Sequence, residues 1–116
     1  MRSGGSGPRA QLARVADGAG PAARAARTAL GDGPAATRLR AAILALTRHR
    51  GAGSSICPSD AARAVGGDGW RELTAQSRSI AFALARDGEV EITQRGAAVD
   101  PQQPSPGPIR IRVRPA

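Results

Sequence analysis

The chain has 116 residues, with 17 arginines, nine acidic residues and no lysine, which gives a formal net charge of +8. This length predicts one domain, and the basic excess favours nucleic acid or another anionic surface as the partner. One cysteine excludes an intrachain disulfide, and no apolar run is long enough for a membrane-spanning helix.

Residues 1–37 predict a disordered basic tail. The segment consists mainly of Gly, Ala, Pro, Ser and Arg, and its large apolar residues beyond Met1 are Leu12, Val15 and Leu30. So little apolar surface does not offset the entropy lost when the backbone is ordered. Good helix formers over residues 21–30 predict only a short helix that frays.

The first stable helix is predicted over residues 37–50. Leu39, Ile43 and Leu46 are spaced by four and three residues, which places them on one helix face. Gly51 then provides a natural stop.

Two further helices are predicted in close succession. A very short strand over 54–57 precedes a helix that begins at Pro58, since proline suits the first helical position. Glycines 66 and 67 end it, and a third helix follows over 70–87. The inner stripe of this third helix consists of Leu73, Ile80 and Leu84, together with Ser77 and Ala81. Phe82 lies outside the stripe.

Alternating apolar and polar residues predict strands at 89–94 and 109–113. They can pair antiparallel across a Gly- and Pro-rich connection over 95–108. Because successive side chains of a strand point to opposite faces, the second strand has an apolar face and a basic face. The apolar face carries Ile109, Ile111 and Val113, and the basic face carries Arg110, Arg112 and Arg114.

The order helix, short strand, helix, helix, strand, loop, strand predicts an α+β fold, a winged helix–turn–helix, over residues 38–116. The second and third helices would form the helix–turn–helix unit, and the last hairpin would form the wing.

Six short segments of the chain also resemble one known family. They are Ala-Ile-Leu-Ala-Leu (42–46), Ser-Ile-Cys-Pro-Ser-Asp-Ala-Ala-Arg (55–63), Trp-Arg-Glu-Leu (70–73), Glu-Ile-Thr-Gln-Arg-Gly (91–96), Val-Asp-Pro (99–101) and Gly-Pro-Ile-Arg-Ile-Arg (107–112). In their order along the chain, these segments resemble a bacterial protein family known as domain of unknown function 3253. The resemblance covers residues 38–114 and implies a small winged-helix-like fold. It implies no activity for any residue.

Seven polar residues are candidate nucleic-acid contacts. Arg and Gln can read guanine and adenine with paired hydrogen bonds, while arginines at every second strand residue recur about 6.6 Å apart, since the rise is about 3.3 Å. That interval is close to the phosphate spacing of one strand. The candidates are Arg71, Gln76 and Arg78 on the third helix, and Arg95, Arg110, Arg112 and Arg114 in the wing.

Two simpler interpretations compete with this one. The basic face can be a solvated edge strand, and Glu89 and Glu91 can lie opposite the wing arginines and neutralise them. The absence of lysine also fits a GC-rich genome as well as it fits selection for phosphate binding.

Enzymatic chemistry is not expected. The glycine-rich segment 66–69 lacks the following lysine of a phosphate-binding loop. His49 has no partner at metal-ligand spacing, so neither a metal nor another cofactor is predicted. Cys57 is expected to be a small buried residue, and Trp70 a cap on the core.

The sequence therefore predicts a duplex DNA-binding protein of bacterial gene regulation. The alternative is a protein–protein interaction module without nucleic-acid binding, in which Phe82 would mark the contact. A single cysteine and the absence of a secretory signal predict a cytoplasmic location.

Overall fold

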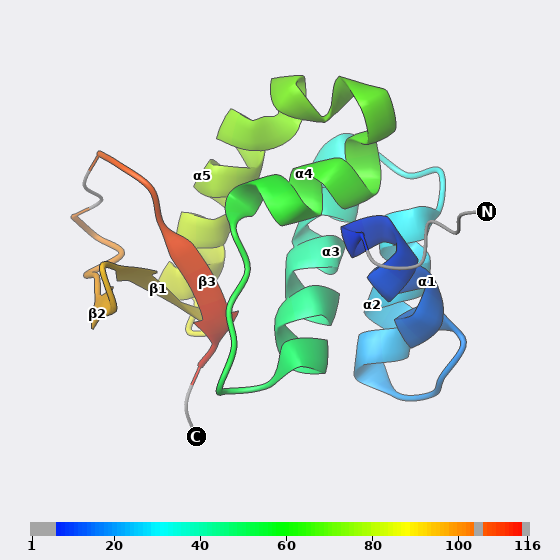
Figure 1. Cartoon of the computed structure of the whole chain (residues 1–116), viewed down its shortest axis with the longest axis horizontal. Helices are drawn as coiled ribbons and strands as arrows, with labels where there is room; N and C mark the ends of the chain where they lie inside the picture. Colours follow the sequence, from blue (N-terminus) through cyan, green and yellow to red (C-terminus); the bar gives the residue numbers. More distant parts are fainter. Residues whose placement is uncertain (1–6, 104–105, 115–116) are drawn as a thin grey trace.

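The computed structural model describes residues 7–103 and 106–114, which form an α+β arrangement of helices around a small antiparallel sheet (Figure 1). In chain order the elements are α1 (Pro8–Ala16), α2 (Pro21–Leu30), α3 (Ala35–Arg50), α4 (Pro58–Gly66), the 3-10 helix η1 (Gly67–Leu73), α5 (Thr74–Arg86), β1 (Val90–Gln94), β2 (Ala97–Ala98) and β3 (Arg110–Val113).

Helix α3 is the centre of the core. The predicted inner face is confirmed, because Leu39, Ile43 and Leu46 are fully buried. Burial goes further than this face, since every residue of 41–47 is buried. The cause is visible in Figure 1, where α1 and α2 cover one side of α3 and the sheet and α5 cover the other. A helix with neighbours on several sides is apolar nearly all round.

The N-terminal segment forms two packed helices in place of the predicted disordered tail. Leu12 of α1 is fully buried, and Ala23, Ala26 and Ala29 of α2 are at most 1% exposed. Leu12, Ala26 and Ala29 belong to the same core cluster as α3. Small alanine side chains allow α2 to approach α3 closely, so burial comes from backbone proximity rather than from large side chains. Residues 1–6 lie outside the described residues.

The third predicted helix is divided into two parts. It begins as the 3-10 helix η1 and continues as α5 from Thr74. The predicted inner stripe is partly wrong, because Phe82 is only 5% exposed whereas Ile80 is half-buried. Contacts with α3, α4 and β1 together cover a wider face of α5 than one stripe.

The sheet has the order β2-β1-β3, with all pairs antiparallel. The predicted pairing of the two long strands is confirmed, with Ile92 opposite Ile111. The short strand expected before α4 is reduced to one bridge between Ile56 and Ile111. The connection contains a two-residue strand that the sequence did not predict. Its turn has positive φ at Arg95 and Gly96, a geometry typical of tight hairpins.

Candidate nucleic-acid interface

The three arginines of the basic strand face are engaged by three different parts of the protein. Arg110 contacts the segment before α4: its Nε donates to Ser55 Oγ at 2.9 Å, its Nη2 to Ser55 O at 2.9 Å and its Nη1 to Cys57 Sγ at 2.7 Å. This guanidinium therefore fastens the start of α4 to the sheet. Cys57 itself is half-buried, rather than fully buried as predicted.

Arg112 is paired with an acid on the neighbouring strand. It lies directly opposite Glu91 in the β1–β3 register, and its Nε donates to Glu91 Oε1 at 2.7 Å within an ion pair. Neutralisation of a basic strand residue by an opposing acid is confirmed at this position.

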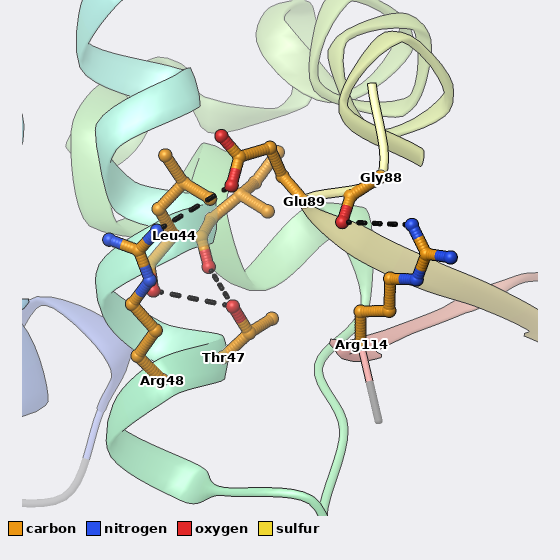
Figure 2. Close-up of polar contacts among 7 residues, drawn as sticks. Leu44, Thr47, Arg48, Gly88, Glu89 and Arg114 are labelled. Carbon is orange, nitrogen blue, oxygen red and sulfur yellow. Dashed lines mark hydrogen bonds and ion pairs between the residues drawn. The ribbon is translucent and has the colours of Figure 1, made fainter. Parts of the chain in front are cut away.

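Glu89 has a different partner from the expected one. It forms an ion pair with Arg48 of α3 at 3.7 Å, while Arg114 donates to the Gly88 carbonyl at 3.5 Å, as Figure 2 shows. Figure 2 also shows the buried Thr47, whose hydroxyl donates to the carbonyl of Leu44 one turn earlier in α3. Arg114 thus lies near the end of α5, whereas Arg110 lies near the start of α4.

Arg95 occupies the tip of the β1–β2 turn. Its side chain is exposed, and among the residues that the structure describes it forms no ion pair with an acidic side chain. Arg95 and Arg110 both line an open groove of about 840 Å³ between this turn and the segment that leads into β3. The structure therefore brings these two candidates to one groove.

On α5, the predicted contacts have different environments. Gln76 is exposed, as are its neighbours Ala75 and Ser79. Arg78 is half-buried, with its Nη1 donating to the Gly107 carbonyl at 2.8 Å. Arg78 therefore ties α5 to the segment that leads into β3, and Gln76 belongs to the solvent-facing surface.

Arg71 lies on η1 and contacts an aromatic ring that the sequence assigned to the core. Its guanidinium carbon is 4.6 Å from the centroid of Trp70, and that of Arg63 is 4.4 Å from the same centroid. The half-buried indole thus faces charge rather than only the core. Sequence reasoning missed Arg63, because the six residues between it and Trp70 span a break between helices.

Two other kinds of site were sought within residues 7–103 and 106–114. No three His, Cys, Asp or Glu side chains gather there as metal ligands. In the same ranges, no helix is both long and apolar enough to cross a bilayer.

A family model described as "Protein of unknown function (DUF3253)" matches residues 36–114. A comparison with curated proteins finds no match. The matched range runs from the second residue of α3 through β3, so α1 and α2 lie outside it. The match confirms the resemblance seen in the sequence and spans well over half of the chain. The protein therefore belongs to the DUF3253 family, whose function is unknown.

Proposed function

We propose that the protein is a winged helix–turn–helix protein that binds duplex DNA, with α5 in the major groove. In this proposal α4 and α5 are the two helices of the helix–turn–helix unit, and η1 is the turn between them. The β1–β3 hairpin is the wing. The element order supports it, as does the position of β3 between β1 and the bridge at Ile56. We further propose a role in bacterial gene regulation in the cytoplasm.

The observation that carries the proposal is the solvent-facing surface at the start of α5. Ala75, Gln76 and Ser79 are exposed there, and their side chains are short enough for close approach to base edges. The first residues of a recognition helix are those that reach the bases. Gln76 can form paired hydrogen bonds with adenine, and the exposed Arg71 precedes it on η1.

The internal contacts divide the candidate residues into two groups. Arg71, Gln76 and Arg95 are exposed and are proposed to contact DNA. Four arginines are proposed to hold the interface in shape: Arg78, Arg110, Arg112 and Arg114, each of which donates to another part of the chain. We therefore expect fewer phosphate contacts than a count of basic residues suggests.

Binding of a labelled random-sequence duplex, measured by fluorescence anisotropy across a salt series, tests the proposal. The full chain is required, because α1 and α2 complete the core around α3. We expect binding whose logarithmic salt slope is about −2, since Arg71 and Arg95 are the two cationic contacts of the proposal and each neutralised phosphate contributes about −0.9. An unchanged anisotropy at low salt would contradict DNA binding.

Matched variants test the assignment of residues within this experiment. Arg95→Gln is expected to reduce the magnitude of the slope by about one. Arg40→Gln removes the same charge from an exposed position of α3 and should leave the slope nearly unchanged. Equal slopes for the two variants would remove Arg95 from the interface.

A second candidate function is a protein-interaction module without nucleic-acid binding. The observation that favours it is the engagement of Arg112 by Glu91, which weakens the positive potential of the strand face. Phe82 is not the contact expected for such a module, because it is buried. Recovery of a stoichiometric partner from nuclease-treated lysate, together with no DNA binding, would favour this candidate.

A further inference from the structure

Two arginines share one tryptophan at the junction of α4 and η1. The guanidinium carbons of Arg63 and Arg71 lie 4.4 Å and 4.6 Å from the centroid of Trp70. Both distances end at the same point, so the two guanidinium groups are no farther than about 9 Å apart. We refer to Arg63, Trp70 and Arg71 as the Arg–Trp–Arg cluster.

The local backbone explains why these three residues meet. Gly66 permits a close approach of η1 to α4, because a Cβ at this position would lie 2.9 Å from Leu73 Cδ1 and 3.6 Å from Trp70 Cβ. The next residue, Gly67, has φ +57°, a conformation that favours glycine. The chain therefore reverses tightly after α4 and returns Trp70 to the side chain of Arg63.

Neither arginine of the cluster is held by an ion pair in the part of the chain that the structure describes. Arg63 and Arg71 are exposed, and within residues 7–103 and 106–114 neither takes part in an ion pair. Asp68 and Glu72 of η1 are also exposed and form no ion pair within the same residues. A cation–π contact restricts the position of the guanidinium group, and because this group carries five N–H donors, donors that do not point at the ring stay available for phosphate.

We propose that the Arg–Trp–Arg cluster clamps backbone phosphates of duplex DNA beside α5, the proposed recognition helix. This inference rests on the proposed DNA binding and adds Arg63 and the orienting role of Trp70, which the sequence did not predict, to the predicted contact of Arg71. Arginine binds phosphate through two parallel N–H···O bonds, and the ring restricts both guanidinium groups before DNA arrives. The first helix of a helix–turn–helix crosses the DNA backbone, and Arg63 lies in the last turn of that helix.

Contacts with phosphate position a protein without reading sequence. The cluster is therefore expected to contribute equally to every duplex, whereas Gln76 contributes to preference between sequences. Stacking of a base on the indole is not the proposed role, since the ring already contacts two guanidinium groups.

The composition of the chain provides a direct reporter for this contact. Trp70 is the only tryptophan and the chain has no tyrosine, so intrinsic fluorescence comes from the cluster itself. The full chain is titrated with unlabelled random-sequence duplex while Trp70 emission is recorded, and a labelled duplex is followed by anisotropy in parallel. We expect emission to change with the same midpoint as anisotropy.

A charge-matched pair of variants then tests the arginine. Arg63→Gln is expected to lower affinity about tenfold, as the loss of a charge-assisted contact would, and to reduce the magnitude of the salt slope by about one. Arg24→Gln removes the same charge from an exposed position of α2 and is expected to change neither quantity appreciably. If Arg63→Gln does not fold, Arg63→Lys keeps the charge and should weaken binding with little change in slope.

The outcomes separate this inference from the proposed function. Binding by anisotropy, together with constant Trp70 emission and equal effects of Arg63→Gln and Arg24→Gln, would overturn the clamp and leave DNA binding in place. No anisotropy change with any duplex would overturn DNA binding and, with it, the clamp. Trp70→Leu provides a second check, because weaker binding at unchanged helix content is expected only if the ring orients the two arginines.

Discussion

Single contacts decide which basic residues of this protein are free to bind a ligand. Arg110 and Arg112 of β3 and Arg114 just after it each donate a hydrogen bond to a different part of the chain. Their acceptors belong to Ser55, Glu91 and Gly88. Arg95 lies in the turn that joins β1 and β2 of the same sheet, and its side chain is exposed. Spacing along a strand therefore predicts the face of an arginine but not its availability.

Removing the acid that neutralises Arg112 should strengthen DNA binding. Glu91→Gln is expected to steepen the salt slope by about one, because it releases one guanidinium. It should lower the free energy of unfolding by less than about 1 kcal/mol, since a partly exposed ion pair contributes little.

The control for this variant is Asp17→Asn, which makes the same charge change at an exposed position after α1. Anisotropy and thermal unfolding measure the two quantities. If both variants bind DNA alike, Arg112 does not face the DNA.

The glycine between α5 and β1 is predicted to be required for stability. Gly88 has φ +79°, and a Cβ there would lie 2.5 Å from Arg114 Nη1. Gly88→Ala should lower the free energy of unfolding by about 1–2 kcal/mol, chiefly because the left-handed conformation is unfavourable for alanine. Gly53→Ala is the matched control, since no atom lies near its Cβ position. Denaturant unfolding that is equal for both variants would contradict this explanation.

At the scale of elements, the N-terminal helices differ most from what the sequence predicts. Both begin at a proline, which is favourable at the first helical position. Arg9 of α1 donates to the Ala64 carbonyl in α4 at 2.8 Å, and Arg50 of α3 contacts Gln11 of α1. These helices lie outside the family match, yet they cover a side of α3 that would otherwise be exposed.

Leu12→Ala measures directly whether α1 is part of the core. The side chain is fully buried, so its truncation is expected to lower the free energy of unfolding by about 2–4 kcal/mol. Ala13→Ser, at the adjacent exposed position, should cost no more than about 0.5 kcal/mol. Denaturant unfolding followed by circular dichroism provides both values. A negligible effect of Leu12→Ala would contradict the packing of α1 into the core and would favour the disordered tail that composition predicts.

At the scale of the whole molecule, the chain has the size of one compact body. Its radius of gyration is 13.3 Å, close to the value of about 13 Å expected for a compact chain of about 100 residues. One core cluster includes residues from α1 through β3. The appended helices, the helix pair α4–α5 and the sheet therefore share a single core around α3.

A shared core predicts a single cooperative unfolding transition. Far-UV circular dichroism reports all helices, whereas Trp70 emission reports the junction of α4 and η1. The two signals are expected to give the same midpoint in denaturant, as in two-state unfolding. Loss of helix signal before any change in Trp70 emission would show that α1 and α2 unfold separately.

The sequence by itself determined α3, α4, the helical segment that contains α5, the strands β1 and β3, and the pairing of these two strands. Helical spacing of Leu39, Ile43 and Leu46 and the alternation in β1 and β3 are local patterns that fix which face is buried. The family match over residues 36–114 covers this same part of the chain.

Only the tertiary structure decided that the N-terminal helices are folded and packed, that Phe82 is buried, and which groups the candidate arginines contact. Each depends on groups far apart in sequence, such as Arg110 with Ser55 and Leu12 with the α3 core. Burial and charge pairing are properties of the surroundings. An alanine-rich helix or an arginine-lined strand therefore acquires its role only when another element packs against it.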